Sequence, residues 1–185
     1  MKRKLLLLSV MVICIAIAAV GTLAFFNTDA IAHNVITTGG VDIELHEYAD
    51  EACTTDYNTN KTGIMPGMTV DKYARIALAK DSADAWVRVK VEKNIKLQGE
   101  GTSDTSLVEL TLNTADWTEK DGYYYYTKVL KPGEVTAPIF TAVTFKPDMG
   151  NEYQNATATV DVYAQAVQTA NNGATAMDAQ GWPNS

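Results

Sequence analysis

The sequence predicts an all-β protein: a single-domain antiparallel β-sandwich of the jelly-roll-like kind, preceded by an N-terminal signal helix. Three observations favour this fold. After the N-terminus, apolar residues recur with a period of two rather than 3.6, which is typical of strands with one buried face. Turn residues separate seven or eight such segments. No long helical pattern follows the first apolar run.

That first run has the features of an export signal. Basic residues at positions 2–4 precede an uncharged apolar stretch, 5–26. Thr22 and Ala24 are small residues at the spacing that a signal peptidase recognises, which predicts cleavage before Phe25. The alternative is an uncleaved anchor, because the run has about the 20 residues that a membrane-spanning helix needs. With cleavage, contact with a membrane is expected only through the signal, before it is removed.

The chain then divides into four regions: a signal peptide (1–24), an N-terminal segment (25–40), a β-sandwich domain (41–168) and a polar C-terminal tail (169–185). Cleavage removes three of the 15 basic residues and none of the 22 acidic ones, which takes the net charge from −7 to −10. So acidic a chain repels phosphate backbones, and no nucleic-acid partner is expected. Only Cys53 remains after cleavage, so the core must stabilise the fold without an intrachain disulfide.

Alternation places the strands in order. Val41, Ile43 and Leu45 alternate with polar residues, and similar alternation marks 68–80, 86–92, 107–112, 134–145 and 156–168. Segments 115–118 and 123–130 are expected to form a hairpin, because the intervening Asp-Gly supplies the positive φ of a tight turn. Small alanines on one face of 156–168 indicate close packing against bulkier residues. Segment 50–63 is predicted to be a surface loop, and Trp182 is expected to dock the otherwise loose tail.

Four consecutive tyrosines, Tyr123, Tyr124, Tyr125 and Tyr126, are the most unusual composition in the chain. On a strand, two of them face the core and two face outward. The outward pair is a candidate binding surface, since tyrosine offers a large contact area at a small entropic cost. The alternative is that both pairs serve only to cover the two faces of the sheet.

Residues for catalysis are not evident. His33 and His46 are the only histidines, thirteen positions apart, and do not form the paired motif of a zinc protease. No glycine-rich phosphate loop or nucleophile elbow is present in the sequence. We therefore predict no catalytic residue, no metal site and no cofactor, and expect a protein that is not an enzyme.

Several stretches resemble a known family. They are "GTLAFFNTD", "VITTGGVDIEL", "MPGMTVDKYARI", "DAWVRVKVEKN", "DGYYYYTKVLKPGEVTAPIF" and "ATATVDVYAQAVQ". In this order and spacing they are similar to the Gram-positive secreted proteins that are exported through the dedicated signal peptidase SipW, the family of the biofilm matrix fibre protein TasA and of camelysin. The resemblance spans most of the chain.

The resemblance implies a jelly-roll sandwich, a SipW-like signal peptidase as a partner, and secretion to the cell surface or the extracellular matrix. For the TasA branch it also implies fibres, in which the N-terminal segment of one subunit adds as a strand to the next subunit, a copy of itself or a related matrix protein. The candidate assembly segment then contains five anchoring residues: Phe25, Phe26, Ile31, Val35 and Ile36. Two alternatives stay open, a secreted binding module that does not polymerise and a camelysin-like metal-dependent endopeptidase.

Overall fold

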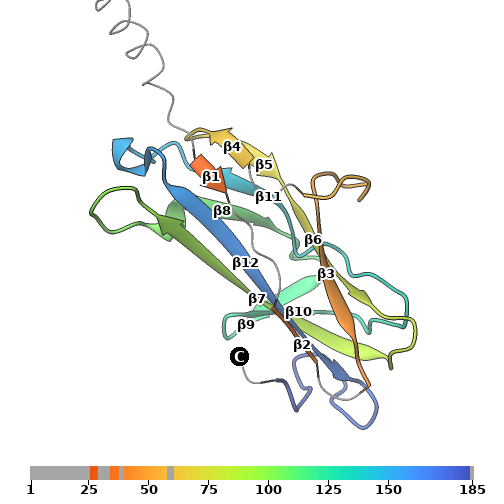
Figure 1. Cartoon of the computed structure of the whole chain (residues 1–185). Helices are drawn as coiled ribbons and strands as arrows, with labels where there is room; N and C mark the ends of the chain where they lie inside the picture. Colours follow the sequence, from red (N-terminus) through yellow and green to blue (C-terminus); the bar gives the residue numbers. More distant parts are fainter. Residues whose placement is uncertain (1–25, 29–33, 38–39, 58–60, 184–185) are drawn as a thin grey trace, which may run out of the picture.

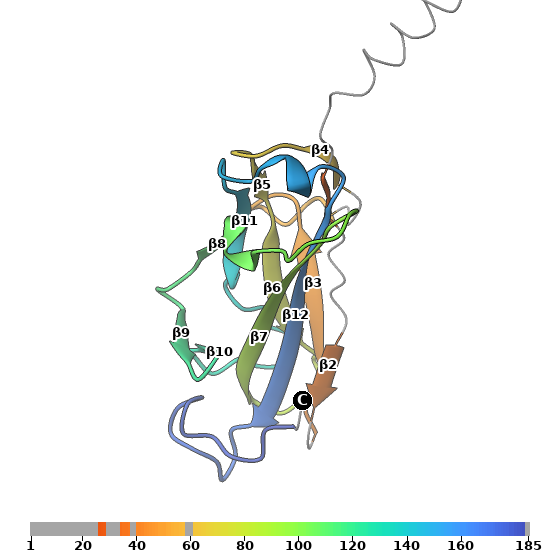
Figure 2. The same cartoon turned by 90° about the vertical axis from the view of Figure 1, so that its left-hand side faces the viewer.

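A computed structural model describes residues 26–28, 34–37, 40–57 and 61–183. The regular secondary structure of the described chain is almost entirely β-strand, arranged in two facing layers (Figures 1 and 2). The only helical turns in these ranges are two short 3-10 helices, Thr105–Leu107 and Asn151–Tyr153. The predicted all-β sandwich is thereby confirmed, whereas the predicted signal helix lies outside the described residues.

The first layer is a seven-stranded sheet with the order β4-β1-β12-β7-β10-β9, and β2 also pairs with β12. Its strands are β1 (Phe26–Thr28), β2 (Asn34–Thr37), β4 (Lys61–Ile64), β7 (Ala85–Lys96), β9 (Trp117–Lys120), β10 (Tyr123–Tyr126) and β12 (Thr157–Gln168). The long strands β7 and β12 pair antiparallel along their whole length, from Thr157 opposite Lys96 to Gln168 opposite Ala85. The strand pairs within the predicted domain 41–168 are antiparallel, as expected. The N-terminal segment differs, because its strands β1 and β2 both run parallel to β12.

The second layer consists of two smaller sheets. One has the order β5-β11-β8 and the other pairs β3 with β6. Their strands are β3 (Ile43–Tyr48), β5 (Thr69–Asp71), β6 (Tyr73–Leu78), β8 (Val108–Leu112) and β11 (Phe140–Phe145). The segment predicted as one strand over 68–80 is divided at Lys72, whose backbone N–H donates to Thr141.

One continuous core fills the space between the layers. The first layer contributes small side chains from β12, among them Ala158 and Ala164, beside Val87 and Val89 of β7. Large side chains such as Phe140 approach from the second layer. This pairing of small with large residues is what the alanines of the last strand predicted, and it allows the layers to pack closely.

The hairpin of β9 and β10 has the predicted Asp-Gly turn, but β9 extends to Lys120 and β10 ends at Tyr126, so the strands differ from the predicted 115–118 and 123–130. Tyr123 is opposite Lys120, and Asp121 and Gly122 have φ values of 54° and 79°. Both values lie in the left-handed region, which Gly and Asp adopt more readily than other residues and which matches the twist of a hairpin.

The C-terminal tail differs from the loose segment that its polar sequence suggested. Up to Pro183 it folds against the outer face of the first layer, where Ala176 and Ala179 join a second, smaller apolar cluster with Trp86. The indole N–H of Trp86 donates to the carbonyl oxygen of Gly173 at 3.0 Å. Trp182 docks on the same cluster, as predicted.

Candidate assembly site

The N-terminal segment adds strands to one edge of the first layer. Asn27 and Thr28 of β1 pair with Thr157 and Ala158 at the start of β12. Towards the other end of β12, the four residues of β2 pair with 163–166. Figure 1 shows β1 and β2 near the two ends of β12. The same edge of one strand therefore receives both parts of the segment.

Strand β1 is an internal strand of the sheet. It pairs parallel with β12 on one side and antiparallel with β4 on the other, where Phe26 is opposite Ile64. Ile64 is buried in the main core. Removing β1 would therefore leave β4 without its partner in this sheet and would unpair one edge of β12 at Thr157 and Ala158. An unpaired edge is the feature that invites a strand from another molecule.

The five predicted anchoring residues are only partly covered by the structure. Phe26 belongs to β1, and Val35 and Ile36 belong to β2. Phe25 and Ile31 lie outside the described residues, as do Thr22 and Ala24 of the predicted cleavage site. The sequence did not predict which strand pairs with the N-terminal segment. Alternation identified β12 as a strand, but alternation carries no information on the neighbours of a strand.

The tyrosine strand β10 presents two different faces, as predicted. Tyr124 and Tyr126 face the main core, and Tyr126 packs on Trp117 with ring centroids 5.0 Å apart. Tyr123 and Tyr125 face the second cluster, below the C-terminal tail. The predicted outward pair is thus partly covered by the protein's own tail.

Arg88 is the centre of this outer face. Its guanidinium carbon lies 4.0 Å from the Tyr123 ring centroid and 4.6 Å from that of Trp182, and its Nε donates to Gln165 at 2.7 Å. Gln165 in turn donates to the carbonyl oxygen of Pro183. The stacked cation and these hydrogen bonds hold the end of the tail on the sheet.

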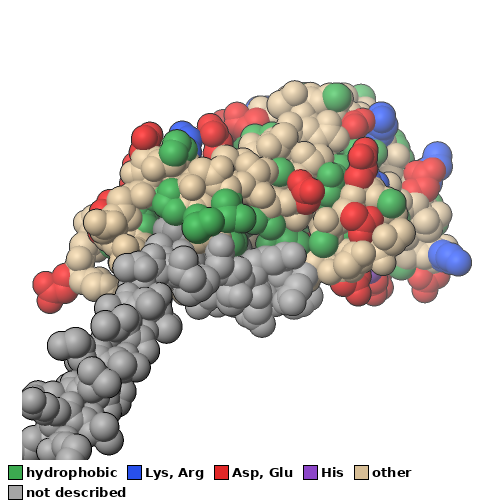
Figure 3. Space-filling model, turned by 90° about the horizontal axis from the view of Figure 1, so that it is seen from above, with side chains coloured by type: hydrophobic (Ala, Val, Ile, Leu, Met, Phe, Trp, Pro, Cys, Tyr) green, Lys and Arg blue, Asp and Glu red, His purple; other side chains and the backbone are tan. Residues whose placement is uncertain are grey.

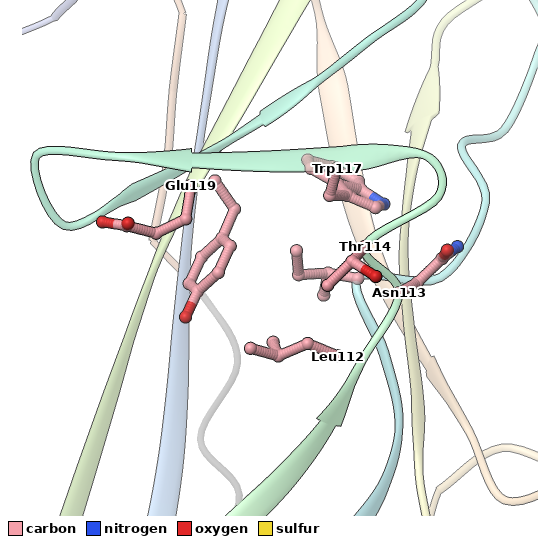
Figure 4. A pocket seen from close by; sticks show the side chains of 7 residues that line it. Leu112, Asn113, Thr114, Trp117 and Glu119 are labelled. Carbon is pink, nitrogen blue, oxygen red and sulfur yellow. The ribbon is translucent and has the colours of Figure 1, made fainter.

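A small apolar pocket of about 200 Å³ lies beside the β9-β10 hairpin. Figure 4 shows Leu112 and Trp117 on facing sides of this space, with Glu119 to one side. Tyr124 and Ile139 also line the pocket. Burial, and to a smaller extent the nearby Glu119, raise the pKa of Tyr124.

Further features of the described residues concern metal binding, membrane spanning and surface charge. Within the described ranges, no three His, Cys, Asp or Glu side chains are grouped so that they could hold a metal ion. No helix in the same ranges is long and apolar enough to cross a membrane. Acidic side chains outnumber basic ones on the face that Figure 3 shows, in keeping with the acidic composition. His46 is half-buried on β3, 3.4 Å from Glu44.

Comparison with family models, with curated proteins and with solved structures finds no match to this chain. The similarity to the TasA and camelysin family therefore stays a prediction from the quoted motifs.

Proposed function

We propose that the protein is a secreted structural subunit of the cell surface or extracellular matrix, which forms fibres by adding its N-terminal segment to the sheet of a neighbouring subunit. The observation that carries this proposal is the parallel pairing of β1 and β2 with one edge of β12. The N-terminal segment, which the sequence predicted to be a donor strand, pairs with β12 in the way that a strand added from another subunit would. In the single chain, it occupies the acceptor edge of its own sheet.

Exchange between subunits would preserve these contacts. The same strand pairs form whether the segment binds its own sheet or the sheet of a neighbour. The free energies of the two states therefore differ mainly through the protein concentration and through the conformation of the residues that connect the segment to the sandwich. The barrier is the opening of the segment. Two register pairs of β1 and four of β2 must separate from β12, and two more of β1 must separate from β4. At about 1 kcal/mol for each pair, the opening costs roughly 8 kcal/mol. Only about one chain in 10⁶ would be open at equilibrium, so assembly should be slow and strongly dependent on concentration.

In this proposal, signal cleavage and the net charge of the chain determine when subunits assemble. Before cleavage the segment is tethered to the membrane at its start, and a tethered end cannot reach a neighbour freely. After cleavage before Phe25, the net charge of −10, obtained by removing three basic residues from a chain of net charge −7, keeps subunits apart. Assembly should therefore be favoured by high local concentration and by conditions that neutralise carboxylates.

Electron microscopy of the protein beginning at Phe25 tests the proposal, with a second protein that lacks residues 25–38. The complete chain should form ordered fibres, and the truncated chain should not. A synthetic peptide of residues 25–38 provides the matched control, because it restores the missing strands but cannot link two subunits. Truncated protein with peptide should fold and stay monomeric, and fibres of the truncated chain would contradict the proposal.

A secreted binding module that does not polymerise is the second candidate. The observation in its favour is the pocket between Leu112 and Trp117, whose size and lining suit one apolar or aromatic group. Substituting Leu112→Trp would fill the pocket without reaching β12. If the protein stays monomeric at high concentration and loses binding of a glycan or peptide with this substitution, the second candidate replaces the first.

A further inference from the structure

Two ionisable residues occupy positions where the sequence alternation places apolar side chains. Lys72 continues the inward series of β5 and β6, between Val70 and Ala74, and it has no exposed surface at all. Glu47 continues the inward series of β3 after Ile43 and Leu45, and its side chain is 8% exposed. A lysine and a glutamate at core-facing positions of two neighbouring strands do not follow from the packing of a β-sandwich.

The two side chains meet inside the second layer. Glu47 is opposite Ala74 in the β3-β6 ladder, two residues from Lys72. The ammonium nitrogen Nζ lies 2.8 Å from Oε1 of Glu47 and 4.7 Å from the ring centroid of Tyr57. Nζ therefore has one close oxygen partner, an aromatic ring over it and no access to solvent.

Burial changes which protonation states these groups prefer. It lowers the pKa of the Lys72 amine, against the opposing effect of Glu47. It also raises the pKa of Tyr57 to about 12, with a smaller contribution from Glu47. A buried ammonium-carboxylate pair can relieve the cost of two desolvated charges by moving one proton, which leaves a neutral amine beside a neutral carboxylic acid. These two neutral forms are the reactants of amide formation.

We propose that Lys72 and Glu47 condense into an intramolecular amide bond that links the β5-β6 junction to β3. The lone pair of the neutral Nζ attacks Cδ of the Glu47 carboxylic acid, and a C–N bond forms. The C–OH bond then breaks, and the hydroxyl leaves with one amine proton as water. The reaction needs no oxidant, reductant or third reactant.

The short distance between the reacting groups and the exclusion of solvent favour this reaction. Reacting atoms in near-attack arrangements are about 3–3.5 Å apart, and Cδ is bonded directly to the oxygen that Nζ contacts. The expelled water leaves an apolar environment, which opposes the reverse hydrolysis. Lys128 and Asp116 provide a natural comparison, since their charged atoms are 2.7 Å apart but the lysine side chain is 64% exposed. That solvated pair should remain an ion pair.

The bond would close a covalent loop over residues 47–72. Strand β4 lies within this loop and pairs with β1 of the assembly segment. The mature chain has only one cysteine, so an amide would supply the covalent constraint that disulfides give to other secreted proteins. The inference does not depend on fibre formation, because it concerns only the interior of one subunit.

Intact-mass measurement of the purified, denatured protein tests the proposal. The expected mass is lower than the sequence mass by one water molecule. Since the Asp121–Gly122 step could also lose water as a succinimide, trypsin digestion must locate the loss. The expected product is a branched peptide that joins the fragment ending at Lys61 to the fragment 62–75, with no cleavage after Lys72. No such branch should join Asp116 to Lys128.

Two substitutions sharpen the result. Lys72→Arg keeps the charge but should restore the full mass, because a guanidinium does not condense. Glu47→Gln keeps the shape and should lose ammonia instead of water, since the leaving group is then the amide nitrogen. Wild-type protein with the full sequence mass, or a mass deficit that persists in Lys72→Arg and does not map to the 47–72 branch, would overturn the proposal.

Discussion

Replacing Trp182 with alanine should release the C-terminal tail while leaving the main core intact. The indole stacks on Arg88 at 4.6 Å and meets the Tyr125 ring edge-on, with centroids 6.0 Å apart and planes at 78°. Trp182 belongs to the smaller outer cluster rather than to the core between the layers. Its loss should therefore act locally.

The magnitude follows from three contributions. A half-buried tryptophan removes roughly 100 Å² from water, which corresponds to about 2.5 kcal/mol. The edge-on aromatic contact adds about 0.5 kcal/mol at the low end of its range, and the exposed cation-π contact adds a similar amount. The free energy of opening the tail should fall by about 3.5 kcal/mol, whereas the free energy of global unfolding should change by much less.

Native-state hydrogen exchange is the suitable assay, because it separates local from global opening. The amide of Asp178, which donates to Thr175, should exchange faster by about two to three orders of magnitude in Trp182→Ala, since each 1.4 kcal/mol is a factor of ten. Met177, 40% exposed in the same tail, gives the matched control, and Met177→Ala should leave this rate unchanged. Equal exchange in all three proteins would refute the docking argument.

Three further predictions concern the sandwich itself. Thr136→Val should cost about 1–3 kcal/mol in chemical denaturation, because the buried Oγ1 accepts from the amide of Ile76, while Thr136→Ser should recover most of it. Gly122→Ala should destabilise the protein by about 1 kcal/mol, because φ is 79° there, and a thermal melt of the two proteins checks it. Hydrogen bonding to Lys128, above all, lowers the pKa of Asp116, so this carboxylate stabilises the fold at pH values above its ordinary pKa and loses that contribution as the pH falls through its lowered folded value. Asp116→Asn should accordingly be less stable than wild type at neutral pH, and urea titrations should show the difference vanish in strong acid.

The sequence predicted the elements of the sandwich because alternation and turn chemistry are local. The Asp121–Gly122 turn fixed the hairpin register, and the alanines of β12 indicated the close packing of the layers. Segment 134–145 was predicted as one strand, but only Phe140–Phe145 is assigned as β11. The preceding residues stay extended and bond to β6 instead, since Ile139 donates to Ala74 across the junction of the two small sheets.

The candidate sites were less predictable because they depend on contacts between distant segments. Periodicity identifies a strand but not its neighbours, so β12 as the acceptor of β1 and β2 required the structure. Lys72 and Glu47 each occupied an inward position in an alternating segment, and that anomaly was visible in the sequence. Their meeting at 2.8 Å was not, because it depends on the β3-β6 register.

Strand exchange is tested most directly by a disulfide between register partners. Asn34 of β2 is opposite Tyr163 of β12, so Asn34→Cys and Tyr163→Cys, combined with Cys53→Ser, place two thiols in adjacent strands. Oxidation of dilute monomers should give an intrachain bond, and oxidation of assembled fibres should give a ladder of covalent multimers on a non-reducing gel. If oxidised fibres gave only monomers with an intrachain disulfide on the gel, the N-terminal segment would have stayed in its own sheet. That result would contradict assembly by strand exchange.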